Sequence, residues 1–273
     1  MTGRTATSAE RLQAALSHRE PDRIPLDIGG TRMSGIHRAA YRRYLDRAGL
    51  SGLDPDPALS DRNQQLARLP EPVLRHLGVD VRGIFPVARP VVETGGDAGD
   101  PADPRDESFR DEWGIGWRRP GREGFYFDVD ACPYADTGPE AARSAPVPDG
   151  GAPFRFARMA EDLDRANGLE AGLVLNGFCS GALELVTRLI GYEDALVDLV
   201  TDPDRVGGWL DRIVEAKMQY WEKALRLSAG RAAVAVEVDD LGTQQGLLMS
   251  RELYRSVLMP RHRRLFSFIR QCD

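Results

Sequence analysis

The sequence predicts an α/β fold of the (β/α)8 barrel type, because strand-like segments alternate with helical ones along the chain. Residues 233–238, AVAVEV, are small and β-branched, which is typical of a parallel strand buried on both faces. Asp239 and Asp240 follow directly, and Ser250 then caps a predicted helix. In barrels of this type the chemistry lies at the C-terminal ends of the strands, where these acids stand.

Four core strands are expected, each followed by a helix. They lie near residues 24–28, 81–87, 173–177 and 233–238. A closed barrel needs eight strands and typically about 250 residues. The chain ends inside the helix after the fourth strand, so we expect about the first four β/α units, as one barrel domain over residues 1–273 that is C-terminally incomplete.

Helix signals recur between these strands. Thr7 to Glu10 has capping-box spacing at the start of the first helix. Further helices are expected around residues 36–45, at 64–69 and at 156–167. Asp202-Pro203 begins another, because a cap residue precedes a proline in the first turn. Its apolar positions recur at helical spacing and predict a core-facing helix: Val206, Leu210, Ile213, Val214, Trp221, Ala224 and Leu225.

An inserted β-hairpin is predicted over about residues 111–130, around the turn at 120–124. Two interpretations of its aromatic residues stay open: they line the mouth of an active site, or they pack the hairpin against the rest of the chain. A surface loop rich in Gly, Pro and Asp is expected at 95–106, just before the hairpin.

Composition limits the possible functions. The net charge of −6 comes from 42 acidic and 36 basic residues mixed along the chain, which argues against a nucleic-acid-binding surface. No apolar run is long enough to span a bilayer, and residues 1–4 do not open a signal peptide. Three scattered cysteines, an odd number, argue against a disulfide framework and fit a reducing cytoplasm. We therefore expect a cytoplasmic protein, without membrane partners.

Polar residues at predicted strand ends form the candidate site. Asp239 and Asp240 are the catalytic candidates, and the alternative is that they only cap the loop and face water. Arg32 follows the first strand and has the guanidinium geometry to bind a substrate carboxylate, or else it locks its own loop. Together with Gln244 and Asn176, Arg32 forms the predicted substrate-binding group.

A family resemblance becomes specific at residues 238–266, VDDLGTQQGLLMSRELYRSVLMPRHRRLF. This stretch resembles the fourth strand–loop–helix unit of the uroporphyrinogen decarboxylase superfamily. That superfamily includes haem-pathway decarboxylases and a branch of zinc-dependent, corrinoid-linked methyltransferases. Residues 9–25, 111–118 and 175–191 also resemble family segments, in order, so the resemblance covers nearly the whole chain.

The resemblance implies cofactors for a complete family member, namely zinc and a corrinoid. In the methyltransferase branch a His-x-Cys pair and a distant Cys hold zinc, which binds the acceptor thiol and lowers its pKa. Those family positions lie beyond residue 273. The four histidines here are far apart, without ligand spacing, and are expected to be surface or packing residues: His18, His37, His76 and His262. Cys179 is likewise expected to pack, so we predict no metal or cofactor bound by this chain alone.

The decarboxylase branch is matched less well. Its segment with paired arginines, Arg-Gln-Ala-Gly-Arg, has no counterpart in Ile28 to Met33. Its tyrosine falls near Thr187, its serine falls at Asp240, and Asp80 is the nearest counterpart of its strand-two aspartate. The sequence after the fourth strand, Asp-Asp-x-Gly-Thr-Gln, resembles the methyltransferase-like branch instead.

Three functions therefore stay open. The first is methyl transfer or demethylation of a small-molecule substrate with a corrinoid or thiol methyl carrier, in an active site completed by a missing C-terminal half or a partner chain. The alternatives are uroporphyrinogen III decarboxylation in porphyrin biosynthesis, and a non-catalytic, partner-dependent half barrel. A corrinoid protein or a complementing C-terminal half is the expected partner. An unpaired sheet edge further predicts an oligomer.

Overall fold

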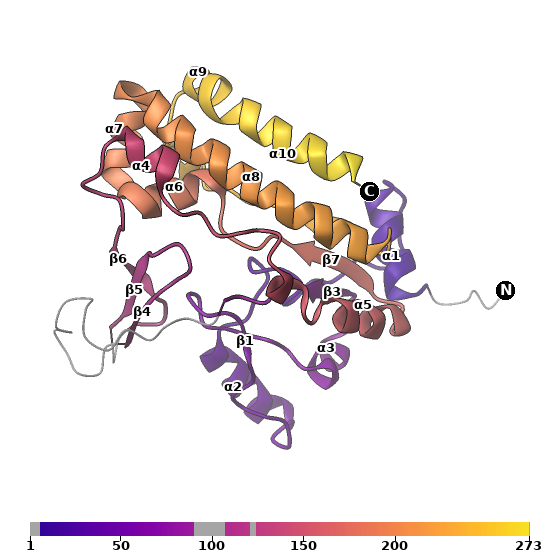
Figure 1. Cartoon of the computed structure of the whole chain (residues 1–273). Helices are drawn as coiled ribbons and strands as arrows, with labels where there is room; N and C mark the ends of the chain where they lie inside the picture. The colour runs from indigo at the N-terminus through magenta and orange to yellow at the C-terminus, as the bar shows by residue number, and fades with distance from the viewer. Residues whose placement is uncertain (1–5, 90–106, 121–123, 273) are drawn as a thin grey trace. The chain divides into compact units, whose positions relative to one another are not determined.

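The computed structural model describes residues 6–89, 107–120 and 124–272 (Figure 1). The predictions for residues 1–4 and for the loop at 95–106 lie outside these ranges. The chain divides into two compact units. The sheet unit comprises Met1–Pro86, Arg158–Asn176 and Ser228–Val236, and the helical unit comprises Val87–Ala157, Gly177–Leu227 and Glu237–Asp273.

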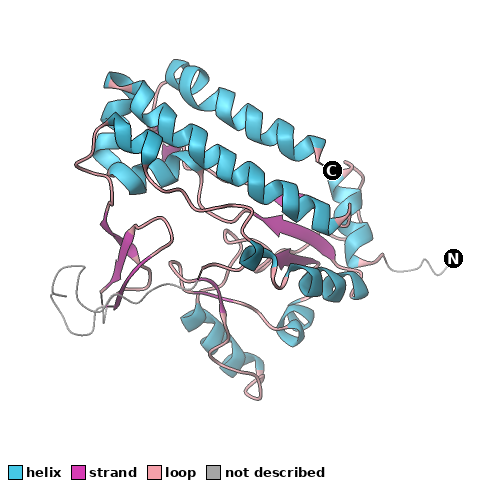
Figure 2. Cartoon of the chain, viewed as in Figure 1, coloured by secondary structure: helices cyan, strands magenta, loops and turns pink. Residues whose placement is uncertain are grey.

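The sheet unit contains three parallel strands in the order β3-β7-β8 (Figure 2). Its strands are β3 (Val81–Ile84), β7 (Gly172–Asn176) and β8 (Val234–Val236), with a small antiparallel pair β1 (Leu59–Asp61) and β2 (Leu66–Ala67). Its helices are α1 (Ser8–Leu16), α2 (Arg38–Ala48), α3 (Glu71–Leu77) and α5 (Met159–Gly168). The predicted α/β class with a parallel sheet is confirmed, and within the described residues this sheet does not close into a barrel.

The core of the sheet unit lies between helices α2 and α3 and strands β3 and β7. Tyr41 of α2, Val73 of α3, Val81 of β3 and Val174 of β7 belong to one buried apolar cluster. All five residues of β7 are buried, as expected of a central strand. The capping box predicted at the start of α1 is confirmed, because Thr7 Oγ1 accepts a hydrogen bond from Glu10 N.

The strand predicted over residues 24–28 is not formed. Leu26 O accepts a hydrogen bond from Asp80 N just before β3, but no ladder continues from it. Pro25 has no N–H to donate, and Ile24 is 85% exposed, so the segment has neither the donor nor the burial that a central strand requires. The fourth predicted strand forms as β8 but is not buried on both faces: Ala235 is exposed, because β8 pairs with β7 at the edge of the described sheet.

The helix predicted at 64–69 is also wrong. Gln65 has a φ of 55°, in the left-handed region that a right-handed helix excludes, and Leu66–Ala67 form strand β2 instead. Its apolar residues are buried as a strand, so periodicity over six residues did not separate helix from strand.

The helical unit is built around α8 (Pro203–Ser228), whose last residue belongs to the sheet unit. All seven of its predicted core positions are buried. The unit's other helices are α4 (Pro139–Ser144), a 3-10 turn (Pro153–Phe156), α6 (Ala182–Ile190), α7 (Tyr192–Thr201), α9 (Arg251–Leu253), a π-helical turn (Tyr254–Leu258) and α10 (Met259–Gln271). Helix α10 runs alongside α8, joined by ion pairs from Arg261 to Asp211 and from Arg264 to Glu215 (Figure 1).

The predicted hairpin insert is a three-stranded antiparallel sheet that begins before residue 111. It consists of β4 (Glu107–Arg110), β5 (Gly116–Arg119) and β6 (Asp128–Ala131). Trp113, Trp117 and Phe127 are buried, which favours the packing interpretation for these three, whereas Phe125 and Tyr126 are exposed. A second antiparallel pair, β9 (Gly242–Thr243) and β10 (Gly246–Leu247), follows β8 in the chain. In the ranges that the structure describes, no helix is long and apolar enough to cross a membrane.

Candidate functional site

Asp239 is a buried carboxylate that caps helix α6. Its Oδ2 accepts a hydrogen bond from Leu183 N at 3.0 Å and its Oδ1 accepts one from Glu184 N at 3.1 Å. These are N–H groups of the first helical turn, which have no partner within the helix. A Cβ on Gly181 would lie 2.2 Å from Asp239 Oδ1, so glycine is what lets the carboxylate reach the helix. Asp239 therefore caps helix α6 and not its own loop, and its side chain is 5% exposed and so does not face water as the alternative expected. Its catalytic role stays a prediction.

The same carboxylate binds a histidine that sequence reasoning set aside. His262 Nε2 lies 3.0 Å from Asp239 Oδ2, and His262 Nδ1 lies 3.4 Å from the hydroxyl of Tyr254. His262 is 9% exposed, so it is a buried packing residue, as expected, and also a hydrogen-bonded one. The pairing joins residues 23 positions apart, and the available signal was a histidine on the helix that follows the acidic pair.

Asp240 differs from its neighbour. Its side chain is exposed, and within the described residues it has no hydrogen-bond partner. Burial raises the pKa of Glu184, and the charges of Asp240 and Asp239 raise it further, against the lowering effect of Arg188. Glu184 still accepts a hydrogen bond from Gly181 N at 3.1 Å. The exposed Asp240 carboxylate thus lies within electrostatic reach of a Glu184 carboxyl whose pKa is raised above its ordinary value.

Glu237, two residues before Asp239, belongs to a buried ion pair. Lys217 of α8 and Glu237 are 1% and 5% exposed, with Nζ to Oε2 at 2.7 Å, and Trp221 Nε1 donates to Glu237 Oε1 at 2.6 Å. Burial alone would lower the pKa of Lys217, but the charges of Cys179 and Glu237 raise it, so the ammonium form is retained. Cys179 is partly buried, and its expected packing role stays a prediction.

Two predicted substrate-binding residues lie in the sheet unit with internal partners. Arg32 pairs with Asp61 at 3.1 Å, as the loop-locking alternative requires. Asn176, the last residue of β7, is 2% exposed, and its Nδ2 donates to the carbonyls of Gly30 at 2.9 Å and Ile84 at 3.4 Å. Asn176 therefore ties together the C-terminal ends of two strands and the turn beside them.

Asp80, the weak counterpart of the decarboxylase aspartate, lies at the opposite, N-terminal end of β3. It is completely buried, and it binds Arg11 Nη1 and Arg23 Nη1, each at 2.6 Å. Burial alone would raise the pKa of Asp80, but hydrogen bonds from Leu26 N, Arg23, Ser8 and Arg11 together hold it below its ordinary value. A carboxylate so occupied does not reach a substrate at the other end of the strand.

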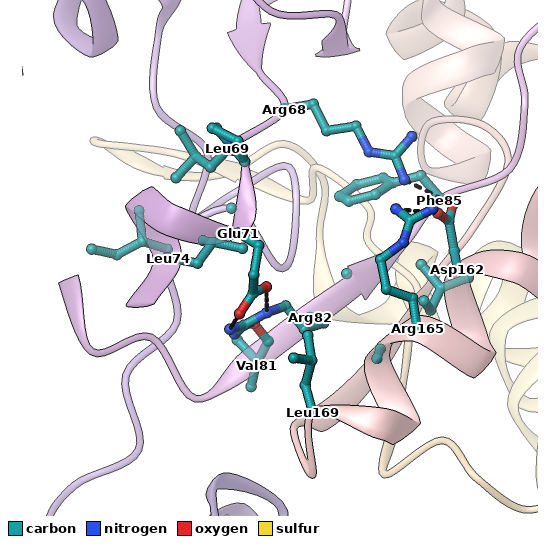
Figure 3. A pocket seen from close by; sticks show the side chains of 16 residues that line it. Arg68, Leu69, Glu71, Leu74, Val81, Arg82, Phe85, Asp162, Arg165 and Leu169 are labelled. Atoms are coloured by element: carbon teal, nitrogen blue, oxygen red, sulfur yellow. Dashed lines mark hydrogen bonds and ion pairs between the residues drawn. The ribbon is translucent and has the colours of Figure 1, made fainter. Parts of the chain in front are cut away.

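Figure 3 shows a pocket of about 220 Å³ in the sheet unit, beside β3 and α5. Its lining includes none of the five residues predicted as a site. All three arginines in the lining are paired: Arg82 with Glu71 at 2.9 Å, Arg68 with Asp162 at 2.7 Å, and Arg165 also with Asp162. The three guanidinium groups share two carboxylates, Glu71 and Asp162, so each arginine of the lining already has an internal partner.

The structure thus places Asp239, Asp240 and Gln244 in the helical unit, and Arg32 and Asn176 in the sheet unit. Gln244 is exposed at the turn between β9 and β10. Within residues 6–89, 107–120 and 124–272, no three His, Cys, Asp or Glu side chains converge as metal ligands. The side chains described here therefore do not fit a zinc ion, and we assign no step to one.

Comparison with known proteins finds a family whose model matches part of the chain. The model of the family described as uroporphyrinogen decarboxylase (URO-D) matches residues 144–273. The fold is similar to the solved structure of a methyltransferase from Methanosarcina mazei, with a TM-score of 0.54 and 18% sequence identity, over 96% of this chain and 67% of that chain. A search of curated proteins gives no match. The family match includes the acidic pair, helix α6 and helix α10, so this part of the chain is similar to the uroporphyrinogen decarboxylase family.

Proposed function

We propose that this protein is a methyltransferase-like member of its superfamily, which moves a methyl group between a small-molecule substrate and a thiol or corrinoid carrier. The observation that carries the proposal is the difference between the two residues of the acidic pair. Asp239 is held in place by hydrogen bonds from α6, whereas Asp240 is exposed and unpaired in the described part of the chain. The similarity of fold to a methyltransferase structure supports the same branch.

In this proposal Asp240 and Gln244 contact the substrate, because both are exposed in the segment that follows β8. Asp239 keeps that segment in position through its cap on α6. Arg32 and Asn176 stay proposed substrate-binding residues of the sheet unit by itself. Their present partners, Asp61 and two backbone carbonyls, would have to be exchanged or shared when substrate binds.

Methyl transfer to a thiol requires that the thiol lose its proton and that the leaving atom take one up. When a thiol accepts the methyl group, the S–H proton departs, a sulfur–carbon bond forms, and the bond from carbon to the leaving atom breaks. Glu184 is the proposed donor of a proton to the leaving atom, because burial raises the pKa of this carboxyl although Arg188 pairs with it. The methyl carrier is a separate molecule in this scheme, so a corrinoid protein remains the proposed partner.

Uroporphyrinogen decarboxylation is the second candidate, favoured by the description of the family whose model matches residues 144–273. Two features of the chain speak against it. Asp80 lies at the N-terminal end of β3 and is fully engaged with arginines. Thr187, near the position of the decarboxylase tyrosine, is buried in α6, and its hydroxyl donates to Glu184 O.

The test is a direct comparison of the two reactions with the purified protein. A panel of methylated amines, ethers and thioethers carrying a labelled methyl group is incubated with a small thiol or with a reduced corrinoid, and the methylated acceptor is quantified. Uroporphyrinogen is offered in parallel, and coproporphyrinogen is measured. Protein-dependent methylation of the acceptor supports the proposal, and coproporphyrinogen alone replaces it with the second candidate. Neither product from a cooperatively folded protein overturns both, in favour of a non-catalytic, partner-dependent role.

A further inference from the structure

The geometry points to a proton relay in the helical unit, in which Tyr254 acts as a catalytic base through His262 and Asp239. The three side chains form one line of hydrogen bonds: Tyr254 Oη to His262 Nδ1 at 3.4 Å, and His262 Nε2 to Asp239 Oδ2 at 3.0 Å. This is the arrangement of a reacting hydroxyl, a base and a group that orients the base. The relay rests on the proposed function only for the identity of the group that gives up its proton.

The direction of each hydrogen bond follows from Asp239. Its two oxygens already accept from the backbone N–H groups of Leu183 and Glu184, so the carboxylate acts as an acceptor throughout. The proton between Asp239 and His262 therefore belongs to Nε2. In the neutral imidazole this leaves Nδ1 without a proton, and Nδ1 is then the acceptor for the hydroxyl of Tyr254.

The rings of Tyr254 and His262 meet although the two residues are eight positions apart, with 5.9 Å between ring centroids. The backbone between them is irregular. Tyr254 is the first residue of a π-helical turn, Tyr254–Leu258, and Pro260 follows this turn without an N–H for the ordinary helical ladder. Single π-helical turns of this kind are frequently found at functional sites.

Tyr254 is the end of the relay nearest to the proposed substrate-contacting segment. The side chains of His262 and Asp239 are 11% and 5% exposed, whereas Tyr254 is half-buried and stands in the helix that begins just after that segment. The exposed fraction of the side chain thus falls from imidazole to carboxylate, and the tyrosine is the residue placed to meet a bound molecule. A proton arriving from a bound molecule meets the tyrosine first.

The thiol acceptor gives its proton to Tyr254 Oη while Tyr254 gives its own proton to His262 Nδ1, which leaves an imidazolium beside the carboxylate of Asp239. The electron pair freed on the sulfur forms the bond to the methyl carbon. The bond from that carbon to the leaving atom breaks, its electron pair stays on the leaving atom, and that atom takes its proton from Glu184. The imidazolium then releases its proton to solvent through Tyr254 Oη, and Glu184 takes up a proton from solvent.

A purely structural role would use the same contacts to hold α10 against the loop after β8. Tyr254→Phe separates the two roles, because it removes only the hydroxyl. Tyr192→Phe on α7 is the matched control, since Tyr192 is exposed and outside the relay. We expect Tyr254→Phe to lower kcat for methyl transfer by about 100-fold or more, with KM and the melting temperature nearly unchanged, and Tyr192→Phe to alter none of these.

A measurement independent of activity completes the test. In ¹⁵N-labelled protein, the ring nitrogens of His262 should show a proton on Nε2 and none on Nδ1, and Tyr254→Phe should shift the Nδ1 resonance. A proton on Nδ1, or full activity of Tyr254→Phe, overturns the relay. If the wild-type protein transfers no methyl group but His262 shows the expected tautomer and response, the proposed function fails while the relay stands.

Discussion

Asp80 in the sheet unit and Asp239 in the helical unit are both buried aspartates, but their partners differ. Asp80 binds two guanidinium groups, those of Arg11 and Arg23. Asp239 binds two backbone N–H groups and the imidazole of His262. A guanidinium keeps its proton at every accessible pH, whereas an imidazole gains and loses one near neutrality. The first network can therefore only hold the fold together, whereas the second can also move a proton.

The largest expected loss of unfolding free energy is at Asp80. Asp80→Asn removes the charge that compensates Arg11, which is itself only 4% exposed. Removing one partner of a buried ion pair typically costs about 3–5 kcal/mol of unfolding free energy. Asp22 still pairs with Arg11 at 2.6 Å, so we expect a value near the lower end. Urea unfolding followed by circular dichroism measures it.

Asp164→Asn is the matched control, because it makes the same change at an exposed pair with Arg231. Exposed pairs contribute little, so this variant should unfold like the wild type. Equal losses for Asp80→Asn and Asp164→Asn would show that the guanidinium network of Asp80 is not what stabilises the sheet unit.

Acid should reveal the same network in the unmodified chain. Because the pKa of Asp80 is lowered in the folded state, its contribution is fully present above its ordinary value of about 3.9 and is lost as the pH falls through the lower, folded value. The unfolding free energy of the wild type should therefore fall more steeply between about pH 5 and pH 2 than that of Asp80→Asn. Parallel curves in urea unfolding over this range would contradict the assignment.

Asp239→Asn should cost less than Asp80→Asn, about 1–2 kcal/mol, since it weakens a helix cap without leaving a buried guanidinium unpaired. An asparagine has one acceptor oxygen for the two N–H groups of α6, and its amide nitrogen, in the place of Oδ2, donates and cannot accept the Nε2 proton. Thermal unfolding measures the stability change. The ring nitrogens of His262 report the changed tautomer, which Asp80→Asn should leave untouched.

Much of the fold was predictable because long periodic segments identify themselves. Helix α8 and strand β7 carry enough apolar residues in one pattern to exclude other structures. The failures are short and depend on single backbone features. Pro25 interrupts the expected first strand, and the left-handed conformation of Gln65 turns an expected helix into strand β2. Neither can be read from apolar periodicity alone.

The candidate site was predictable only in part. The position of Asp239 and Asp240 after a strand drew attention to the right segment, but not to the different surroundings of the two side chains. His262 escaped because a lone histidine on a helix has no nearby ligand in the sequence. Its partner is Asp239, which binds both α10, through His262, and the start of α6, through Leu183 N. This arrangement is a property of the tertiary structure.

The smallest expected effect on stability is at Asp240. This residue is adjacent to Asp239 but does not share its hydrogen bonds to α6. An exposed side chain without a partner in the described structure should tolerate Asp240→Asn within about 0.5 kcal/mol. The variant still removes a charge that raises the pKa of Glu184, so that pKa should move toward its ordinary value, which ¹³C carboxyl titration would detect. An unchanged stability with a lowered pKa of Glu184 and reduced methyl transfer would assign Asp240 to chemistry and Asp239 to its support. A large loss of stability would instead place both aspartates in the scaffold, alongside Asp80.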